Sequence, residues 1–469
     1  MRDVDGALPD GMTVVLGRQV KLLDSGRALL GGAPTRMLYL TAYARTLIAD
    51  RRITVRDAAT RALAERLLEA GMADPVLGSL PAVPADQITW VIPAYGRPQS
   101  LDRLLASIGA GAQVIVVDDC SPNGRAVEKV VLDHAARYVR LARNVGPAGA
   151  RNEGLRRVST PFAVFADSDL VVDRAAVVEL LRHFADPRVA VVAPRISGLE
   201  DEQGLSWIGR YEHARSSLDM GCYPALVRPR SPVSWLPGAC LLVRVEALGT
   251  GFSADMRVGE DVDLVWRLAE AGWRIRYEPA ATVWHEHRQT VSEWLGRKRF
   301  YGSSADRLAS NHPLAIAPAV LHPWTVGVIV ALMAQRRWSL PVAAVISLFA
   351  SRRIAATLTR SEHPVLLSSQ LTARGIGAAL NQTMALLLRH WWPLAAVGSI
   401  GSRRVRRAVL VSGVADAVIE YRRLRPRLDF PRFMLARRLD DLAYGTGLWL
   451  GAIKGRSARA LLPDFRRKT

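Results

Sequence analysis

Short apolar runs alternate with amphipathic stretches between residues 88 and 305. The runs ITWVIPAY, QVIVVDDC, YVRLA and FAVFAD are rich in β-branched and aromatic residues, which is typical of buried strands. Between them, QSLDRLLASIGA and AVEKVVLDHAA place apolar residues at helical spacing. The alternation predicts an α/β domain over residues 86–305 with a doubly wound, parallel sheet. Ligands of such sheets bind beyond the carboxyl ends of the strands.

The N-terminal residues carry a different pattern. TVVL and VKLLDSGRALL predict short strands, MLYLTAYARTLI predicts a helix, and ITVRDAATRALAERLLEAG predicts a second helix. Thr54 and Asp57 have the spacing of a capping box, and Gly71 ends the second helix. Strands and helices at this size favour a winged-helix-like domain, which with the Pro-rich linker PVLGSLPAVPADQ occupies residues 1–85.

The chain becomes strongly apolar after residue 312. PLAIAPAVLHPWTVGVIVALMA has no formal charge over residues 313–334 and is long enough to span a bilayer, whereas the following WSLPVAAVISLFA is short. We therefore expect apolar membrane segments over 306–350, with one span near 313–334, and a basic amphipathic helical tail over 351–469. A re-entrant or interfacial helix is the main alternative, and a buried helix of a soluble domain is another.

The charge distribution changes the expected partner. The net charge is +20, and residues 401–469 hold 17 Lys plus Arg against 6 Asp plus Glu. A basic tail beside an apolar run is typical of attachment to an anionic membrane surface. A nucleic-acid binder is the competing class, but the N-terminal domain is not strongly basic. Three cysteines without a paired pattern, and an N-terminus without a signal-peptide core, place the expected catalytic part on the cytoplasmic side.

Polar clusters follow four successive predicted strands or the loops between them. Because the ends of parallel strands share one edge, four clusters in order favour a binding site over ordinary solvated turns. Backbone and aromatic groups near residue 95 suit a nucleobase, paired carboxylates suit ribose or base, and the Gly-rich loop suits a diphosphate. The candidate donor-binding residues are Pro93, Ala94, Tyr95, Arg97, Asp118, Asp119, Arg143, Asn144, Gly146, Arg151, Asn152 and Asp167.

The run VFADSDL ends an apolar strand with Asp167 and Asp169, one residue apart. Alternate side chains at a strand end point the same way, and hard cations prefer carboxylate oxygens. A solvated turn is the alternative for an isolated pair of this kind. The segment WHEH adds His285 and His287 on one face of an extended stretch, and one of them can complete a Mg²⁺ or Mn²⁺ shell.

A second carboxylate pair precedes a predicted helix. Glu260 and Asp261 stand at its start, where the helix dipole favours an ionised Asp261 that can act as a general base. Simple capping of the helix is the alternative. Trp235 and Gly238 are candidates for the acceptor side, although each could equally belong to the core.

Taken in order, VIPAYGR, VVDDCSPN, RNVGPAGARNEGL, FADSDL, PGACLLVR, GFSADMRVGEDVDLVWRL and WHEH resemble family 2 glycosyltransferases of GT-A fold. The resemblance covers about residues 88–290. It implies a nucleotide-sugar donor and inversion at the anomeric carbon. It also implies nucleoside binding by Asp118 and Asp119, metal-diphosphate binding by Asp167 and Asp169 with a histidine, and Asp261 as the base.

The order of domains also resembles the glycosyltransferases of the mycofactocin system. This implies a UDP-sugar donor, specifically UDP-glucose, and a β-1,4-linked oligosaccharide built on a peptide-derived redox cofactor or its precursor. The N-terminal segment resembles leader-peptide-recognition domains, which implies an exposed strand edge for a peptide. The competing interpretation keeps the chemistry but gives the enzyme a lipid-linked or cell-envelope glycan as acceptor.

Overall fold

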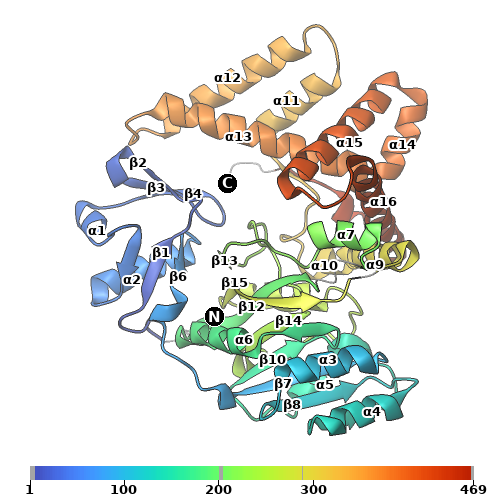
Figure 1. Cartoon of the computed structure of the whole chain (residues 1–469). Coiled ribbons are helices and arrows are strands. Elements are labelled where there is room, and N and C mark those ends of the chain that lie inside the picture. Colours follow the sequence, from blue (N-terminus) through green and yellow to red (C-terminus); the bar gives the residue numbers. More distant parts are fainter. Residues whose placement is uncertain (1–5, 200–203, 288, 466–469) are drawn as a thin grey trace. The chain divides into compact units, whose positions relative to one another are not determined.

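The computed structural model describes residues 6–199, 204–287 and 289–465, and the alternating pattern after residue 88 forms one large sheet in it (Figure 1). Its strands are β7 (Ile88–Ala94), β8 (Gln113–Asp118), β9 (Arg137–Arg140), β10 (Phe162–Ala166), β11 (Leu170–Val172), β12 (Val189–Gly198), β13 (Ala225–Leu226), β14 (Cys240–Arg244) and β15 (Arg274–His285). The order is β11-β15-β12-β14-β10-β7-β8-β9, with β13 also paired to β15.

The predicted parallel sheet is confirmed only in part. β10, β7, β8 and β9 run parallel, as the alternation of strands and helices requires. β14 is antiparallel to both β10 and β12, and β11 is antiparallel to β15. The sheet is therefore mixed. The carboxyl ends of β7, β8 and β10 still share one edge, and the predicted polar clusters lie there.

Helices cover the sheet with the apolar faces that their sequences predict. They are α3 (Pro98–Ile108), α4 (Gly124–Asp133), α5 (Gly146–Leu155), α6 (Arg174–Glu179) and α8 (Glu260–Glu270). In α3, Leu101, Leu104 and Leu105 recur at helical spacing and are buried against Trp90 and Val164 of the sheet in one apolar core. This core holds the strand ends, and hence the candidate site, in place.

The N-terminal residues form two small antiparallel sheets and two helices. The elements are β1 (Thr13–Leu16), β2 (Lys21–Leu23), β3 (Ala28–Gly31), β4 (Arg36–Tyr39), α1 (Ala42–Thr46), β5 (Arg52–Thr54), α2 (Ala58–Glu69) and β6 (Ala73–Pro75). One sheet has the order β5-β1-β6 and the other β2-β3-β4. This arrangement, with more strand than helix, does not confirm the winged-helix expectation.

Two local expectations in the N-terminal part are corrected. The helix expected from Met37 begins only at Ala42, because the preceding residues pair with β3 as strand β4. The capping box of α2 is made by Asp57 and Thr60, whereas Thr54 ends strand β5. Asp57 accepts from the Thr60 N–H at 2.8 Å, and this hydrogen bond lowers the pKa of its carboxyl.

Buried ion pairs join the N-terminal part to the large sheet. Arg276 on β15 pairs with Asp74 on β6, and Arg274 on the same strand approaches Glu69 of α2 at 3.8 Å. Arg228 reaches both the carboxylate and the backbone carbonyl of Glu69 at the end of α2. Together with the sheet, the N-terminal part belongs to one compact unit, residues 1–203 with 216–287.

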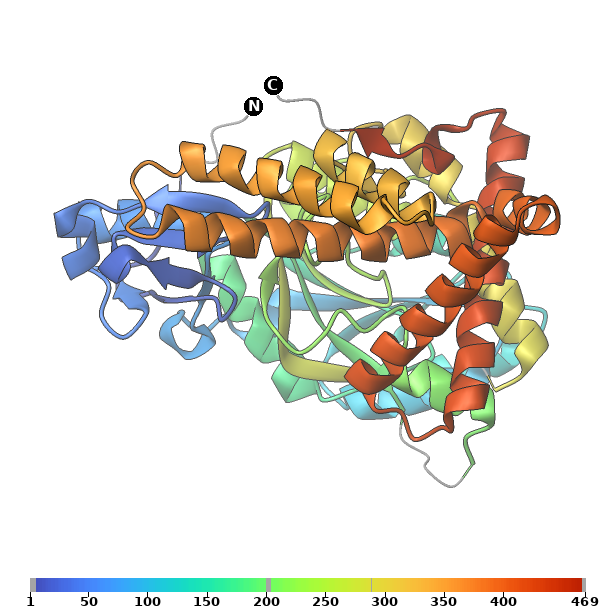
Figure 2. The same cartoon turned by 90° about the horizontal axis from the view of Figure 1, so that it is seen from above.

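The second compact unit, residues 204–215 with 288–469, is mainly helical (Figures 1 and 2). Its helices are α7 (Trp207–Ala214), α9 (Val291–Gly302), α10 (Ala305–Asn311), α11 (Pro323–Met333), α12 (Ser339–Thr357), α13 (Pro364–Ala385), α14 (Trp392–Gly401), α15 (Arg403–Leu424) and α16 (Phe430–Gly455). In Figure 2, α12 and α13 run side by side along most of their lengths.

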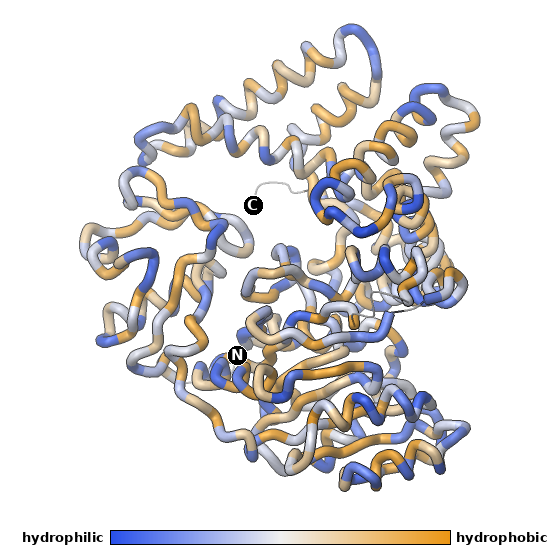
Figure 3. The backbone as a smooth tube through the Cα atoms, in the orientation of Figure 1, coloured by the Kyte–Doolittle hydropathy of each residue, from blue (hydrophilic) through white to orange (hydrophobic). Residues whose placement is uncertain are grey.

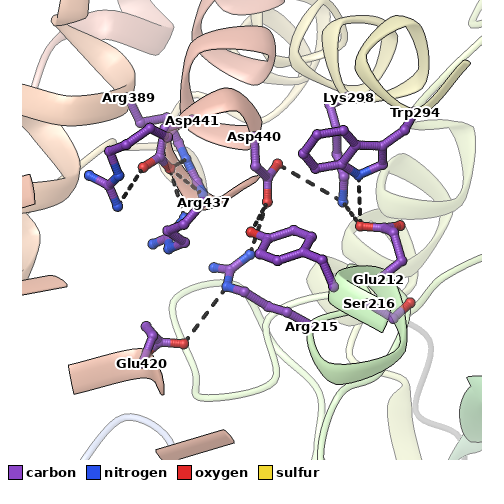
Figure 4. Close-up of polar contacts among 12 residues, drawn as sticks. Glu212, Arg215, Ser216, Trp294, Lys298, Arg389, Glu420, Arg437, Asp440 and Asp441 are labelled. Atoms are coloured by element: carbon purple, nitrogen blue, oxygen red, sulfur yellow. Dashed lines mark hydrogen bonds and ion pairs between the residues drawn. The ribbon is translucent and has the colours of Figure 1, made fainter. Parts of the chain in front are cut away.

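Charges inside this unit neutralise part of the basic tail (Figure 4). Asp440 on α16 accepts from the Tyr211 hydroxyl at 3.0 Å and from Arg215 at 3.2 Å. Burial alone would raise the pKa of Asp440, but the cations Lys298 and Arg215 hold it at about 2. Lys298 also pairs with Glu212 at 2.9 Å. The tail therefore includes a packed helical unit with internal ion pairs, and Tyr211 belongs to its core.

The helix of membrane-spanning length differs from the expected one. The run 313–334 contains α11, whose 11 residues cover about 16 Å, whereas a bilayer core of about 30 Å needs about 20 residues. Among the described residues, α12 alone has the length and apolar composition to cross a membrane, and it extends past the expected boundary at 350. Its Leu340 and Phe349 side chains are exposed, and Figure 3 shows apolar stretches along it. Membrane attachment itself stays a prediction.

Candidate active site

The first two polar clusters meet at the ends of β7 and β8. The Asp119 N–H donates to the Ala94 carbonyl at 2.9 Å, and the Gly96 N–H donates to the Ser121 hydroxyl at 2.8 Å. Ala94 is buried, Pro93 is half-buried, and the Tyr95 ring is 56% exposed. An exposed ring at this edge is available to a flat ligand such as a nucleobase.

The two adjacent carboxylates after β8 have different roles. Asp118 is fully buried and accepts from the Ser121 N–H at 2.9 Å, the Tyr138 hydroxyl at 2.7 Å and Arg140 at 2.7 Å. These contacts brace the loop, so the structure gives Asp118 a supporting position behind the edge. Asp119 accepts from the backbone N–H groups of Val145 and Gly146 at 2.7 and 2.9 Å.

Asp119 therefore anchors the start of α5, and burial is the main cause that raises the pKa of its carboxyl. Gly146 begins the helix with a φ of +83°, a left-handed conformation that favours glycine. Just before it, Arg143 and Asn144 are exposed, and the Asn144 amide donates to the Asp119 carbonyl at 3.2 Å. Both remain candidates for contact with a diphosphate.

Asn152 does not lie with this group. Its amide nitrogen donates to the Phe252 carbonyl at 2.8 Å, and its amide oxygen accepts from the Phe252 N–H at the same distance. Both polar groups of the side chain are used to hold the chain before α8. The structure therefore gives Asn152 a role in loop positioning that its place in a Gly-rich segment did not indicate.

Asp169 lies against His285 because of strand register. β11 and β15 are antiparallel with Leu170 opposite His285, which brings His285 Nε2 to 3.5 Å from Asp169 Oδ1. Arg97 Nη1 approaches the other Asp169 oxygen at 3.4 Å. His287 is buried, with its ring centre 6.3 Å from that of His285. Of the two histidines, His285 is the one beside the paired carboxylates.

Asp167 comes directly after β10, where its N–H donates to the Ala239 carbonyl at 2.8 Å. Burial and the Asp169 charge raise the pKa of its carboxyl, while Arg151 acts in the opposite direction. Within the described parts of the chain, no three His, Cys, Asp or Glu side chains converge closely enough to hold a metal ion as they stand. The donor types nevertheless fit Mg²⁺ or Mn²⁺. They are two nearby carboxylates that repel each other, and the His285 imidazole, whose buried Nδ1 has no hydrogen-bond partner among the residues that the structure describes.

The start of α8 presents the second carboxylate pair. Gly259, with a φ of +81°, turns the chain so that Glu260 and Asp261 begin the helix. Asp261 accepts from the Gly238 N–H at 2.7 Å and from the Val262 N–H at 2.8 Å. Burial, followed by the Glu260 charge, raises the pKa of Asp261 to about 6. The expected dipole effect is thus outweighed, although Asp261 is still mostly ionised at neutral pH.

Arg151 differs most from its expected role as a diphosphate donor. Only 3% of the residue is exposed, and its Nη atoms donate to Glu260 at 2.8 Å and to Asp167 at 2.7 Å. Gly238, a candidate for the acceptor side, is buried between Arg151 and Asp261. Trp235 is half-buried three residues earlier. The structure thus joins Asp167 and Glu260 through one internal cation, and Asp261 is linked to that cation through Gly238.

One further basic residue was not identified from the sequence. Arg257 is exposed in the loop before Glu260, and its charge lowers the pKa of Asp119 against the larger raising effect of burial. Arg257 thus adds a positive charge to the surroundings of Asp119, from the loop that leads to Glu260 and Asp261. The only sequence signal was a basic residue in ADMRVGED, which is not distinctive by itself.

Comparison with known proteins identifies one relative over nearly the whole chain and others over part of it. Residues 89–249 match the protein family described as Glycosyl transferase family 2. The pre-mycofactocin glycosyltransferase of Mycobacterium tuberculosis is 41% identical over an alignment of 469 positions, which covers 98% of this chain and 99% of that protein. The poly-β-1,6-N-acetyl-D-glucosamine synthase of Staphylococcus aureus is 26% identical over 45% of this chain and 51% of its own. A solved mannosyltransferase from Pyrobaculum calidifontis, in complex with GDP-Man and Mn²⁺, is 19% identical over 65% of this chain and 90% of its own, with a TM-score of 0.38.

Proposed function

Because this chain belongs to glycosyl transferase family 2, we propose that it transfers a hexose from a nucleotide sugar to the peptide-derived precursor of mycofactocin. The observation that carries the proposal is the identity of 41% to a pre-mycofactocin glycosyltransferase, which extends over nearly the full length of both chains. The similarity includes the N-terminal part and the helical unit as well as the sheet. It is explained most simply if this chain and that relative use the same acceptor.

The donor edge is proposed to hold the nucleotide. The Tyr95 ring and the loop around Asp119 lie where a base and ribose would bind, while Arg143 and Asn144 are exposed beside them. We assign the diphosphate to the side of Asp169 and His285. A divalent metal ion bound by Asp167, Asp169 and His285 would stabilise the negative charge that develops on the leaving diphosphate.

Asp261 is proposed as the general base. It stands at the start of α8 with both carboxylate oxygens fixed by backbone N–H groups, and its pKa of about 6 lies close to physiological pH. A base with that pKa is largely ionised at pH 7 and can accept the proton of an acceptor hydroxyl. Attack by that oxygen on the face of the sugar opposite the diphosphate gives inversion. Glu260, held by Arg151, supports the position of Asp261.

The finer identity of the product is part of the same proposal. The resemblance of this chain to mycofactocin-system enzymes supports UDP-glucose as donor and a β-1,4-linked oligosaccharide as product. The N-terminal part supports a peptide-derived acceptor, because β2 and β4 are edge strands of a three-stranded sheet and can add an extended peptide. Net charge and the apolar α12 support attachment to the cytoplasmic face of an anionic membrane.

A second acceptor is favoured by the same helix. α12 has the length and composition of a membrane span, and an enzyme held at a membrane could extend a lipid-linked or cell-envelope glycan. Deletion of residues 1–85 distinguishes the two acceptors. Transfer to a lipid-linked glycan should persist in the shortened protein if it remains folded, whereas transfer to a peptide-derived acceptor should be lost.

The decisive experiment incubates the purified full-length protein with a panel of nucleotide sugars, Mg²⁺ or Mn²⁺, and either the mature cofactor or its peptide precursor. Nucleotide release and product mass are followed together, with Asp261→Asn as the inactive control. Addition of hexose units to the cofactor or precursor, absent in the control, supports the proposal. Release of UDP to water without a glycosylated product points to the lipid-linked acceptor. No turnover of any donor contradicts the proposed activity.

A further inference from the structure

Arg151 is a buried cation that the donor-binding function does not explain. It lies on α5, with 3% of the residue exposed. Its two terminal nitrogens contact three separate segments: Glu260 at the start of α8, Asp167 after β10, and the Gly238 carbonyl at 3.2 Å. The Phe252 ring lies 5.3 Å from the guanidinium and shields it further. The remaining Nε is buried and has no hydrogen-bond partner in the described residues.

Burial of the Arg151 charge is unfavourable unless acceptors compensate for the lost water. Removing a guanidinium from water is strongly unfavourable, and only well-placed acceptors offset this cost. Arg151 has two carboxylates as acceptors, and they belong to opposite sides of the reaction: Asp167 to the donor side and Glu260 to the base side. A cation placed between two carboxylates fixes their separation, because each is drawn to the same rigid, planar group.

Gly238 connects the cation to the base. Its N–H donates to Asp261 Oδ2 at 2.7 Å, while its carbonyl accepts from Arg151 Nη2. A Cβ atom at this position would lie 3.0 Å from the Asp261 Cβ and 3.4 Å from Arg151 Nη2. The first distance is tighter than most packing contacts, so an alanine here would displace Asp261 by a few tenths of an ångström. Glycine therefore allows the closest approach between the two side chains.

We propose that Arg151 and Gly238 form an internal brace that positions Asp261 relative to Asp167, and that Arg151 makes no contact with the donor. The inference rests on the proposed function, since it assigns the distance between the base and the donor side to these two residues. Arg151 is a positioning residue, and it acts through Gly238 and Glu260. A misplacement of about 1 Å in such a site can lower the rate of reaction about 100-fold.

The test measures kcat, the donor KM and UDP binding for Arg151→Lys and Gly238→Ala in the full-length protein. Arg151→Lys should lower kcat about 100-fold, and Gly238→Ala, which displaces Asp261 less, about tenfold. Both variants should leave the donor KM and the Kd for UDP within about threefold of wild type. The double variant should be little worse than Arg151→Lys alone, because both changes disrupt the same unit. Arg156→Gln is the matched control, since this exposed arginine near the end of α5 pairs only with Glu153 among the described ion pairs.

The outcomes are distinct. A donor KM or a UDP Kd raised tenfold or more, with kcat preserved, would mean that Arg151 binds the donor and would overturn the brace. Unchanged kinetics in both variants would also overturn it. If Arg151→Lys fails to fold, Gly238→Ala still decides, because it keeps every charge. Failure of the wild-type protein to transfer any hexose is a different result, which contradicts the proposed function itself.

Discussion

Replacing Asp261 with Asn removes the proposed base while keeping the size of the side chain. Burial and the Glu260 charge raise the pKa of Asp261 to about 6. The carboxylate is then about nine-tenths ionised at pH 7 and about one-tenth ionised at pH 5. In the wild type, kcat/KM should therefore fall about tenfold for each pH unit below 6. Asp261→Asn should lower kcat about 10²–10⁴-fold and remove this acidic limb, because no base is left to titrate.

The same pKa predicts an effect on stability with a defined sign. A carboxyl whose pKa is higher in the folded state binds its proton more tightly there, so protonation stabilises the fold and this stability is lost as pH rises. From the ordinary pKa of 3.8 and the folded value of about 6, the wild type should lose about 2 kcal/mol of unfolding free energy between pH 4.5 and pH 7 through this group. Asp261→Asn should not show that loss.

Urea unfolding of both proteins at the two pH values measures this difference. Between pH 4.5 and pH 7, the unfolding free energy of the wild type should fall by about 2 kcal/mol more than that of the variant. In the variant, the Asn amide group faces the Gly238 or Val262 N–H and can lower stability by an amount that does not depend on pH. Comparing the pH dependence of the unfolding free energy in the two proteins cancels this constant loss. Equal slopes, or an acidic limb that persists in Asp261→Asn, would refute the assignment of the raised pKa to this carboxyl.

Three further predictions concern other parts of the molecule. Arg276→Met should lower the unfolding free energy by about 3–5 kcal/mol, because it leaves Asp74 buried without its partner. Adding Asp74→Leu to that variant should restore most of the loss, and a loss under about 1 kcal/mol in urea unfolding of Arg276→Met contradicts the prediction. His285→Ala should raise the Mg²⁺ or Mn²⁺ concentration needed for half-maximal activity about 10–100-fold, whereas an unchanged metal titration argues against ligation. Leu348→Ser with Phe349→Ser should weaken co-sedimentation with anionic vesicles several-fold, since both side chains are exposed on α12, and undiminished binding would exclude that face.

The sequence was sufficient for features set by local pattern. The strands β7, β8 and β10 were predictable because β-branched runs have period-two or continuous apolar patterns, and polar residues mark where each strand ends. That the carboxyl ends share an edge followed from the parallel arrangement. The positions of Asp119, Asp169 and Asp261 at strand and helix ends needed no further information.

Other roles depended on partners that are distant in the chain. Arg151 was expected to face the donor, but it meets Asp167 and Glu260, which are 16 and 109 residues away. Asn152 holds a backbone segment 100 residues away. Local sequence gives the type of a side chain and the element that carries it. It does not say which of several acidic groups an arginine will contact after folding.

The sequence by itself determined the order of chemical groups along the chain, the family resemblance that they carry, and the elements that present them. The tertiary structure decided which of these groups meet. The register of β11 against β15 sets His285, and not His287, beside Asp169. Burial decided the balance at Asp261, where desolvation outweighs the helix dipole. The physical reason is that dipoles, turns and periodicity act over a few residues, whereas desolvation and ion pairing depend on the whole packed environment.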